Sequence, residues 1–279
     1  MLKKAYVEIT NRCNLHCSFC PGTKRAPRAM SPKEFDLVLS RLAGLVLYVY
    51  LHVMGEPLAH PQLAALLALA AAREMKVCIT TNGTLLARQA ETLLAAPALH
   101  KISVSLHSFE GNDSAQELER QYLEEVWAFS DRAAARGIIV ALRLWNDGGA
   151  QTRNGAIEAF LHEKCPGEWP EPRRGSLRLR ERLYLEHAGK FDWPDRAAPE
   201  RGTQFCYALR DQFGVLSDGT LVPCCLDHEG DIALGNLFSQ PLEEILRSPR
   251  AQAVRDGFSR RCPAEELCRR CGFAARFNR

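Results

Sequence analysis

Three cysteines lie close together near the start of this 279-residue chain, in the stretch ITNRCNLHCSFC at 9–20. Cys13, Cys17 and Cys20 follow a C-x3-C-x2-C spacing. Thiolates in such a triple can bind three irons of a [4Fe-4S] cluster and leave the fourth iron without a protein ligand. A structural zinc site, the main alternative, takes four protein ligands, usually as two close pairs. The triple therefore favours an open cluster with one free coordination position.

A second group of cysteines lies near the end of the chain, where six of the eleven fall between 206 and 271. The N-terminal MLKKAYVEIT lacks the apolar region of a signal peptide, and the longest apolar stretch, 63–72, is too short to cross a bilayer. We therefore expect a cytoplasmic protein, whose thiols stay reduced and bind metals or clusters rather than form disulfides. With its CC and CxxC pairs, the C-terminal group alone is also compatible with a zinc ribbon.

The composition is that of an ordinary folded protein, with 46% hydrophobic and 25% charged residues. The net charge of +3 is small and spread along the chain. Charge of this size gives no argument for a polyanionic partner, so neither a nucleic acid nor a membrane is expected.

Strand-like and helical segments alternate through the first two-thirds of the chain. Strands are predicted at 5–10, 45–53, 76–81, 101–106, 138–144 and 176–186. Helical patterns lie between them, the first with Ser31 as N-cap and Pro32 at its first position. Repeated βα units predict an α/β fold with a parallel sheet, and six of them predict a partial (β/α)6 TIM-like barrel. Active sites of parallel barrels form at the carboxyl ends of the strands, and the cysteine triple follows the first strand.

Alternation along the strands predicts a polar interior, because successive side chains point to opposite faces of a sheet. The predicted inward residues are Glu8, Thr10, Tyr48, Tyr50, His52, Cys78, Thr80, Asn82, Ser103, Ser105, His107, Arg143, Trp145, Arg178, Arg180, Arg182, Tyr184 and Glu186. We interpret this set as the lining of a binding cavity. The alternative is that the last strand has a solvated edge face.

The pattern changes near 187–204, where glycine, proline and charged residues accumulate. We place a domain boundary here, with the barrel at 1–195 and a small cluster-binding domain at 196–279. FGVLSDGTLVPCC predicts a β-hairpin with Asp218 and Gly219 at its turn. A helix over PLEEILRSPRAQAVRDGF and the ending RCPAEELCRRCGF complete this domain.

The cysteine triple resembles the signature of the radical SAM superfamily, in which an aromatic residue, here Phe19, precedes the last cysteine. The resemblance implies that S-adenosylmethionine (SAM) chelates the open iron through its amino and carboxylate groups. It also implies cofactor contacts at residues that match the family's motifs: Gly55 and Glu56 of MGEP, which hold the SAM amino group, Asn82 of TTNGTLL, which shapes the floor near the cofactor, and Ser105 and Arg143. Met54 departs from the commoner glycine, and His107 stands where many relatives have an aspartate.

The C-terminal cysteines resemble the twitch domain, the shortened form of the SPASM extension of this superfamily. Cys206, Gly219 and Cys224 reproduce its C-x(9–15)-G-x4-C segment, and Cys268 and Cys271 supply the closing pair. The resemblance implies one auxiliary [4Fe-4S] cluster with these four thiolates as its ligands.

Other cysteines leave alternatives open. Cys225 could replace Cys224 by a shift of one residue, and Cys262 is an alternative ligand or a spare thiol. Cys78 and Cys165 are expected in the core or near the surface rather than as ligands.

The family resemblance implies an enzyme that generates a 5'-deoxyadenosyl radical for hydrogen abstraction. We expect oxidation or another modification of a small molecule, with the auxiliary cluster as electron conduit and a donor such as flavodoxin or ferredoxin. Arg178 and Arg180, if they face the lumen, suit an anionic substrate group. The candidates for a catalytic acid, base or radical relay are polar or aromatic residues predicted to face the lumen, Tyr50, His52, His107, Trp145 and Tyr184, together with Arg178 and Arg180.

Two other functions remain open. The first is a peptide- or protein-modifying maturase, acting on a ribosomally made peptide or a sulfatase. Such maturases often carry an N-terminal leader-binding domain, whereas the first predicted strand here begins at residue 5, which favours a small-molecule substrate. The second is a zinc-binding module without enzymatic activity.

Overall fold

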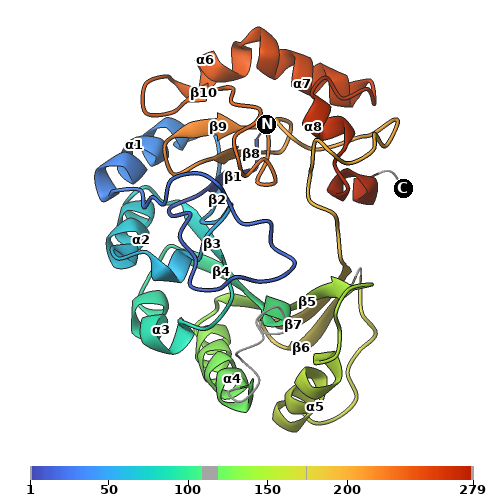
Figure 1. Cartoon of the computed structure of the whole chain (residues 1–279). Coiled ribbons are helices and arrows are strands. Elements are labelled where there is room, and N and C mark those ends of the chain that lie inside the picture. Colours follow the sequence, from blue (N-terminus) through green and yellow to red (C-terminus); the bar gives the residue numbers. More distant parts are fainter. Residues whose placement is uncertain (1, 109–118, 174, 278–279) are drawn as a thin grey trace.

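The computed structural model describes residues 2–108, 119–173 and 175–277. A single curved sheet of ten strands runs through the protein (Figure 1). In sheet order the strands are β10 (Gly235–Asn236), β9 (Thr220–Val222), β8 (Gln212–Val215), β1 (Lys4–Val7), β2 (Tyr48–Tyr50), β3 (Lys76–Thr81), β4 (Leu99–Ser105), β5 (Ile139–Asp147), β7 (Leu183–Gly189) and β6 (Ser176–Arg180). Strands β1, β2, β3, β4, β5 and β7 are parallel neighbours. The predicted α/β fold is confirmed.

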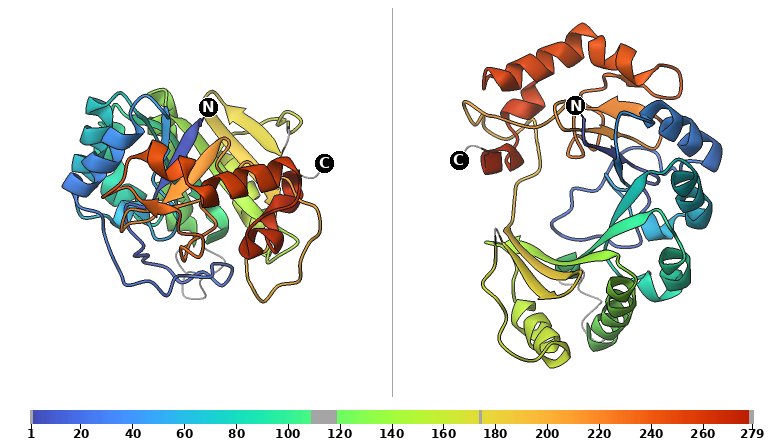
Figure 2. Two further views of the ribbon diagram at one scale, coloured as in Figure 1. Left: turned by 90° about the horizontal axis from the view of Figure 1, so that it is seen from above. Right: turned by 180° about the vertical axis from the view of Figure 1, so that it is seen from behind.

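Helices cover the outside of the curved sheet, as Figures 1 and 2 show. They are α1 (Pro32–Leu42), α2 (Leu63–Ala72), α3 (Leu86–Leu94), α4 (Glu119–Ala135) and α5 (Asn154–Lys164). Near the C-terminus follow α6 (Leu242–Arg247), α7 (Pro249–Ser259) and α8 (Glu266–Arg269). The sheet does not close into a barrel, and the segment after β7 crosses the open side (Figure 1).

Helix α1 shows how local sequence fixes these elements. Ser31 and Glu34 form a reciprocal capping box, in which the Ser31 hydroxyl accepts a hydrogen bond from the Glu34 backbone and the Glu34 carboxylate accepts one from the Ser31 backbone. The buried residues Phe35, Val38, Leu39 and Leu42 recur at helical spacing, so one face of the helix packs on the sheet. The predicted start of this helix is confirmed.

The predicted strand 176–186 is wrong. The segment forms two antiparallel strands, β6 and β7, joined at Glu181 and Arg182. Arg182 adopts a left-handed backbone with φ of +62°. Nothing in the sequence signals this turn, because left-handed turns usually carry glycine or asparagine.

The predicted single helix at 241–258 is also wrong, since α6 and α7 are separate. The break falls at Ser248, which caps α7 and precedes Pro249 at its first position. A residue before proline is pushed out of the helical region by clash with the proline ring.

The predicted C-terminal hairpin is confirmed, with β8 and β9 antiparallel and Gly219 at φ of +85° in the turn. Strand β8 also pairs in parallel with β1, so the sheet continues across the predicted domain boundary at 195/196, which stays a prediction. No helix in the described part of the chain is long and apolar enough to span a membrane.

Candidate functional site

The loop between β1 and α1 carries the cysteine triple and is closed at its base by hydrogen bonds. The Asn11 side chain donates to the Ala26 carbonyl at 2.9 Å and accepts from the Arg28 backbone at 2.7 Å. The Thr10 hydroxyl donates to the Arg28 carbonyl at 2.9 Å. The two arms of the loop are thereby joined, while the three cysteines between them stay exposed or half-exposed.

Each thiol of the triple lies against a different neighbouring loop. The sulfur of Cys20 is 4.0 Å from the thioether sulfur of Met54, in the loop after β2. The side-chain nitrogen of Asn82, after β3, is 3.9 Å from the sulfur of Cys13. The sulfur of Cys17 is 3.7 Å from a backbone carbonyl oxygen of the short helix η2 (Leu106–Ser108), which follows β4. The triple lies over three adjacent strand ends, and accessible thiols there fit a cluster with one open iron.

Gly55 allows the loop after β2 to pack directly on the cysteine loop. Its φ is +77°, and a Cβ there would lie 2.4 Å from the Thr10 carbonyl oxygen and 2.8 Å from that of Arg12. The next backbone nitrogen, of Glu56, donates to the same Arg12 carbonyl at 2.8 Å. Only glycine fits this close approach of two backbones.

The carboxylate of Glu56 joins the loops after β2 and β3. It is buried and accepts hydrogen bonds from the Leu58 backbone at 3.0 Å, the Thr81 hydroxyl at 2.7 Å and the Asn82 backbone at 2.8 Å. Burial raises the pKa of Glu56, and these hydrogen bonds oppose that rise. Its contact with the SAM ammonium group stays a prediction.

A cavity of about 390 Å³ lies inside the curve of the sheet. Residues expected from the sequence line it: Phe19, Tyr50, His52, Thr80, Ser105, His107, Arg143 and Trp145. The size and the mixed lining are typical of a small-ligand site. Alternation along the strands therefore predicted the part of the wall that β2, β3, β4 and β5 supply. The other residues predicted to face inward do not line the cavity: Glu8, Thr10, Tyr48, Cys78, Asn82, Ser103, Arg178, Arg180, Arg182, Tyr184 and Glu186.

Arg143 is held at the centre of the wall. Its side chain donates to the Glu186 carboxylate at 3.1 Å and to the Thr80 hydroxyl at 3.4 Å, and its guanidinium lies 4.3 Å from the ring centre of Trp145. Burial disfavours the charge of Glu186, but Arg143 and Lys101 outweigh it and lower the pKa of that carboxyl. The positive charge of Arg143 is therefore already paired.

The two inward histidines differ in their surroundings. His107 places Nδ1 3.1 Å from the Arg143 carbonyl oxygen and packs its ring on Phe19, with 5.0 Å between ring centres. The His52 ring is T-shaped to the Tyr6 and Tyr50 rings, with 5.2 and 6.0 Å between ring centres, and burial lowers its pKa to about 3. His52 is therefore neutral at physiological pH.

Arg178, Arg180 and Tyr184 do not line the cavity. Because 176–186 is a hairpin with an irregular register after Arg178, Arg180 pairs with Leu183 and turns toward the helices. It forms an ion pair with Asp131 of α4. Arg178 is exposed on the edge strand opposite Tyr184. The predicted anion site at the two arginines is wrong.

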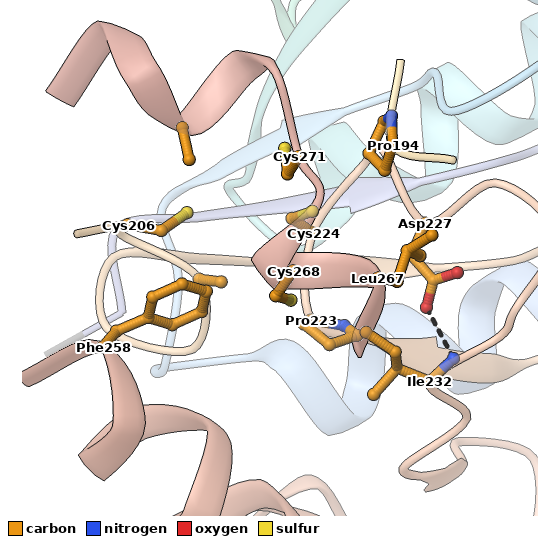
Figure 3. Close-up of a pocket in the computed structure, with 12 residues that line it drawn as sticks. Pro194, Cys206, Pro223, Cys224, Asp227, Ile232, Phe258, Leu267, Cys268 and Cys271 are labelled. Atoms are coloured by element: carbon orange, nitrogen blue, oxygen red, sulfur yellow. Dashed lines mark hydrogen bonds between the residues drawn. The ribbon is translucent and has the colours of Figure 1, made fainter. Parts of the chain in front are cut away.

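The C-terminal cysteines come together around one pocket. Cys206, Cys224, Cys268 and Cys271 all line it, with their sulfur atoms around a shared space (Figure 3). The rest of the lining is mainly apolar, including Ile232, Phe258 and Leu267, while Asp227 is held by backbone hydrogen bonds from residues 231 and 232.

Burial raises the pKa of all four thiols, that of Cys206 to about 11. Thiolates in such a setting need a cationic partner such as cluster iron. Among the described residues, no three Cys, His, Asp or Glu side chains converge on the position of a single metal ion. Four thiols around a shared space fit a fully ligated cluster.

The remaining cysteines lie elsewhere. Cys225 lines the central cavity beside Tyr6, whereas Cys224 lines the pocket formed by the four C-terminal thiols. Cys262 is exposed and outside the pocket lining. Cys78 is buried and Cys165 is half-buried, in line with the expectation for them.

Glu8, predicted to face inward, forms a buried junction. It is fully buried and accepts two hydrogen bonds from Arg25 of the cysteine loop, at 2.8 and 2.6 Å. It also accepts from the backbones of Met54 at 3.1 Å and Ser217 at 3.1 Å. Arg25 donates further to the His228 carbonyl at 2.8 Å. The hydrogen bonds of this pair thus connect the cysteine loop and the loop after β2 to the C-terminal region.

Sequence reasoning missed part of the cavity wall. Lys190, Phe191 and Trp193 belong to the segment treated as a domain boundary, and Phe273 follows the last cysteine. Tyr6 was also missed, although it lies two residues before Glu8 in the predicted strand and so points to the same face of the sheet. The one sequence signal for the first group is an aromatic pair, FDW, inside an otherwise polar segment.

Comparison with known proteins agrees with this arrangement. The model of the radical SAM superfamily matches residues 7–146, and that of the SPASM iron-sulfur cluster-binding domain matches residues 206–272. The chain belongs to the radical SAM superfamily. It is therefore an enzyme that uses SAM with a [4Fe-4S] cluster and carries an auxiliary cluster. The alternative of a zinc-binding module without enzymatic activity is therefore wrong.

Individual relatives are distant. GTP 3',8-cyclase of Chlorobaculum tepidum is 31% identical over 133 residues, which cover 46% of this chain and only 40% of the relative. The solved structure of BtrN in complex with AdoMet and 2-DOIA is 17% identical, with a TM-score of 0.61 over 97% of this chain and 93% of BtrN. Streptococcus suis SuiB bound to precursor peptide SuiA is 15% identical, with a TM-score of 0.56 over 98% of this chain and 71% of SuiB. The two structures show a shared fold.

Proposed function

We propose that this enzyme abstracts a hydrogen atom from a small molecule held in the central cavity, with the auxiliary cluster exchanging an electron with that cavity. When bound, the first cluster and SAM supply the 5'-deoxyadenosyl radical for the abstraction. The observation that carries the proposal is the position of the cavity. Phe19 of the cysteine triple lines one part of it, and Cys225, next to Cys224 of the thiol pocket, lines another.

The proposed roles of the chain's residues follow from this position. The cluster ligands are Cys13, Cys17 and Cys20 for the first cluster and Cys206, Cys224, Cys268 and Cys271 for the auxiliary one. Ser105 and Arg143 orient SAM, Gly55 and Glu56 hold its amino group, and Asn82 shapes the floor beneath it. Because Arg143 is fixed by Glu186 and stacked on Trp145, it holds its geometry before the cofactor binds. The protein's task is to position one C–H bond and exclude water.

Four thiolates leave no iron of the auxiliary cluster free for substrate, which favours electron transfer over substrate ligation. Reducing equivalents would come from a one-electron donor such as flavodoxin or ferredoxin.

The second candidate is modification of a peptide. Its support is the fold shared with SuiB, whose structure holds a precursor peptide, whereas GTP 3',8-cyclase is named for a nucleotide substrate. A cavity of about 390 Å³, part of which SAM would fill, is better suited to a small molecule.

The test is anaerobic reconstitution followed by assay of 5'-deoxyadenosine with SAM and reductant. A cell extract, separated into small-molecule and peptide fractions, is added to find which fraction stimulates the product. Cys17→Ala should abolish formation, whereas Cys262→Ala, at an exposed thiol, should retain it. Iron-loaded enzyme that forms no 5'-deoxyadenosine refutes the proposal. Zinc without acid-labile sulfide in the purified protein refutes the ligand assignments.

A further inference from the structure

The central cavity has two chemically different parts, which meet where the Arg143 guanidinium stacks on Trp145. The proposed function gives SAM the part lined by Ser105 of β4 and Arg143 of β5. The other end is walled by aromatic side chains from three separate segments: Trp145 at the end of β5, Phe191 and Trp193 after β7, and Phe273 in the C-terminal segment η4 (Phe273–Phe277). The proposed function assigns no role to this second end.

The aromatic end is a packed surface rather than a set of isolated rings. Phe191 lies 5.4 Å from Trp193 and 5.1 Å from Phe273, measured between ring centres. The guanidinium of Arg276 lies over three of the rings, 4.8 Å from Phe273, 5.3 Å from Phe191 and 5.7 Å from Trp145. Such a surface favours a planar group, and the cation stacked on it adds positive charge.

The charge of this end is positive and unbalanced. The described lining residues of the cavity include no aspartate or glutamate. Arg143 is paired with Glu186, which leaves Lys190 as the lining cation with no acidic partner within the described residues. The described contacts of Arg276 are the Gly189 carbonyl and the three rings, none of them acidic.

The backbone and the alkyl stem of Lys190 have defined neighbours, while the residue as a whole is exposed. Its backbone donates to the Asp147 carbonyl at 2.8 Å. Its alkyl stem lies against Gly149, where a Cβ would come within 3.1 Å of the Lys190 Cδ atom. The absence of a side chain at 149 therefore leaves the room that the lysine stem uses beside the cavity.

We propose that this end binds a planar substrate group bearing an anionic substituent, a carboxylate or a phosphate. Lys190 meets the anion and the aromatic surface meets the plane, while Arg276, which stacks on three of the rings and is not among the described lining residues, adds positive charge behind that surface. This inference rests on the proposed function, because it names the substrate class of the same cavity. It also replaces the anion site predicted at Arg178 and Arg180.

The test uses matched planar probes on the reconstituted enzyme with SAM bound. The probes are 2-naphthoate, 2-naphthyl phosphate and the cation 2-naphthylmethylamine, with affinity followed by naphthalene fluorescence. Both anions should bind more tightly than the amine, and the stronger of the two identifies the substituent. Lys190→Gln should weaken anion binding about tenfold, as expected for loss of one charged hydrogen bond, and leave amine binding unchanged or stronger.

Two further variants make the result specific. Gly149→Ala keeps the charge but crowds the lysine stem, so it should weaken anion binding by less than Lys190→Gln. Lys33→Gln removes an exposed lysine at the start of α1 and should change nothing. The inference is overturned if the anionic probes and the amine bind equally well. It is also overturned if Lys33→Gln weakens anion binding as much as Lys190→Gln does. Formation of 5'-deoxyadenosine by the wild-type enzyme tests the proposed function separately, so the two can fail independently.

Discussion

Replacing Arg25 by methionine removes the cationic partner of a fully buried carboxylate. Glu8 would keep only its two backbone donors, and its charge would remain unpaired in the interior. Breaking a buried pair from one side costs about 3–5 kcal/mol. Because the Arg25 side chain is 15% exposed, water reaches the pair in part, and we expect about 3 kcal/mol.

The assay is thermal unfolding of the reconstituted protein under anaerobic conditions. A loss of this size lowers the melting temperature by on the order of 10 °C in a chain of this length. The matched control is Arg73→Met. Arg73 forms an ion pair with Asp36, and the Arg73 and Asp36 side chains are 29% and 42% exposed. An exposed pair of this kind is worth about 1 kcal/mol or less.

A double variant checks the physical cause. Glu8→Gln added to Arg25→Met removes the unpaired charge, so the double variant should be more stable than Arg25→Met alone. If Arg25→Met costs no more than Arg73→Met, or if the double variant is the less stable, then the junction does not work through buried charge.

Three other predictions concern the site. Cys224→Ser should lose about four iron atoms per chain while Cys225→Ser keeps them, and equal iron and sulfide content in the two variants would contradict the placement of these thiols. Gly55→Ala should cost about 1–3 kcal/mol and weaken SAM binding, measured by melting temperature and equilibrium titration. Gly137→Ala, with φ of +82° but open space around it, is the control and should leave SAM binding intact. Because burial lowers the pKa of His52 from 6.5 to about 3, the unfolded chain binds a proton in that window that the folded chain does not, and stability falls as pH falls. His52→Asn should flatten this fall by about 1 kcal/mol per pH unit in urea unfolding between about pH 6 and 5, and an unchanged slope would count against a neutral His52 in the folded protein.

Local patterns in the sequence determined much of this protein. Ligand spacing, strand parity and capping depend on near neighbours, so the cysteine triple, the polar wall around Arg143 and the start of α1 could be predicted from residue types alone. The four C-terminal thiols could be grouped for the same reason, since their spacing matches a known ligand pattern. The resemblance to a family supplied the cofactor, which spacing alone did not.

Other features were decided by contacts between distant segments. Arg182 turns the chain without a glycine, so only the pairing of β6 with β7 shows which way Arg180 points. Adjacent thiols at 224 and 225 face different spaces because the sheet continues from β1 into β8 and β9 and sets the direction of the chain that follows. No local pattern encodes such a choice.

The same holds for the aromatic end of the cavity and for the buried junction. Lys190 and Phe273 are far apart in the chain and share a cavity because the segment after β7 crosses the open side of the sheet (Figure 1). Glu8 meets Arg25 and Ser217 because a buried carboxylate is stable only where several donors converge. The sequence by itself determined which chemistry the chain can hold, and the tertiary structure decided what surrounds it.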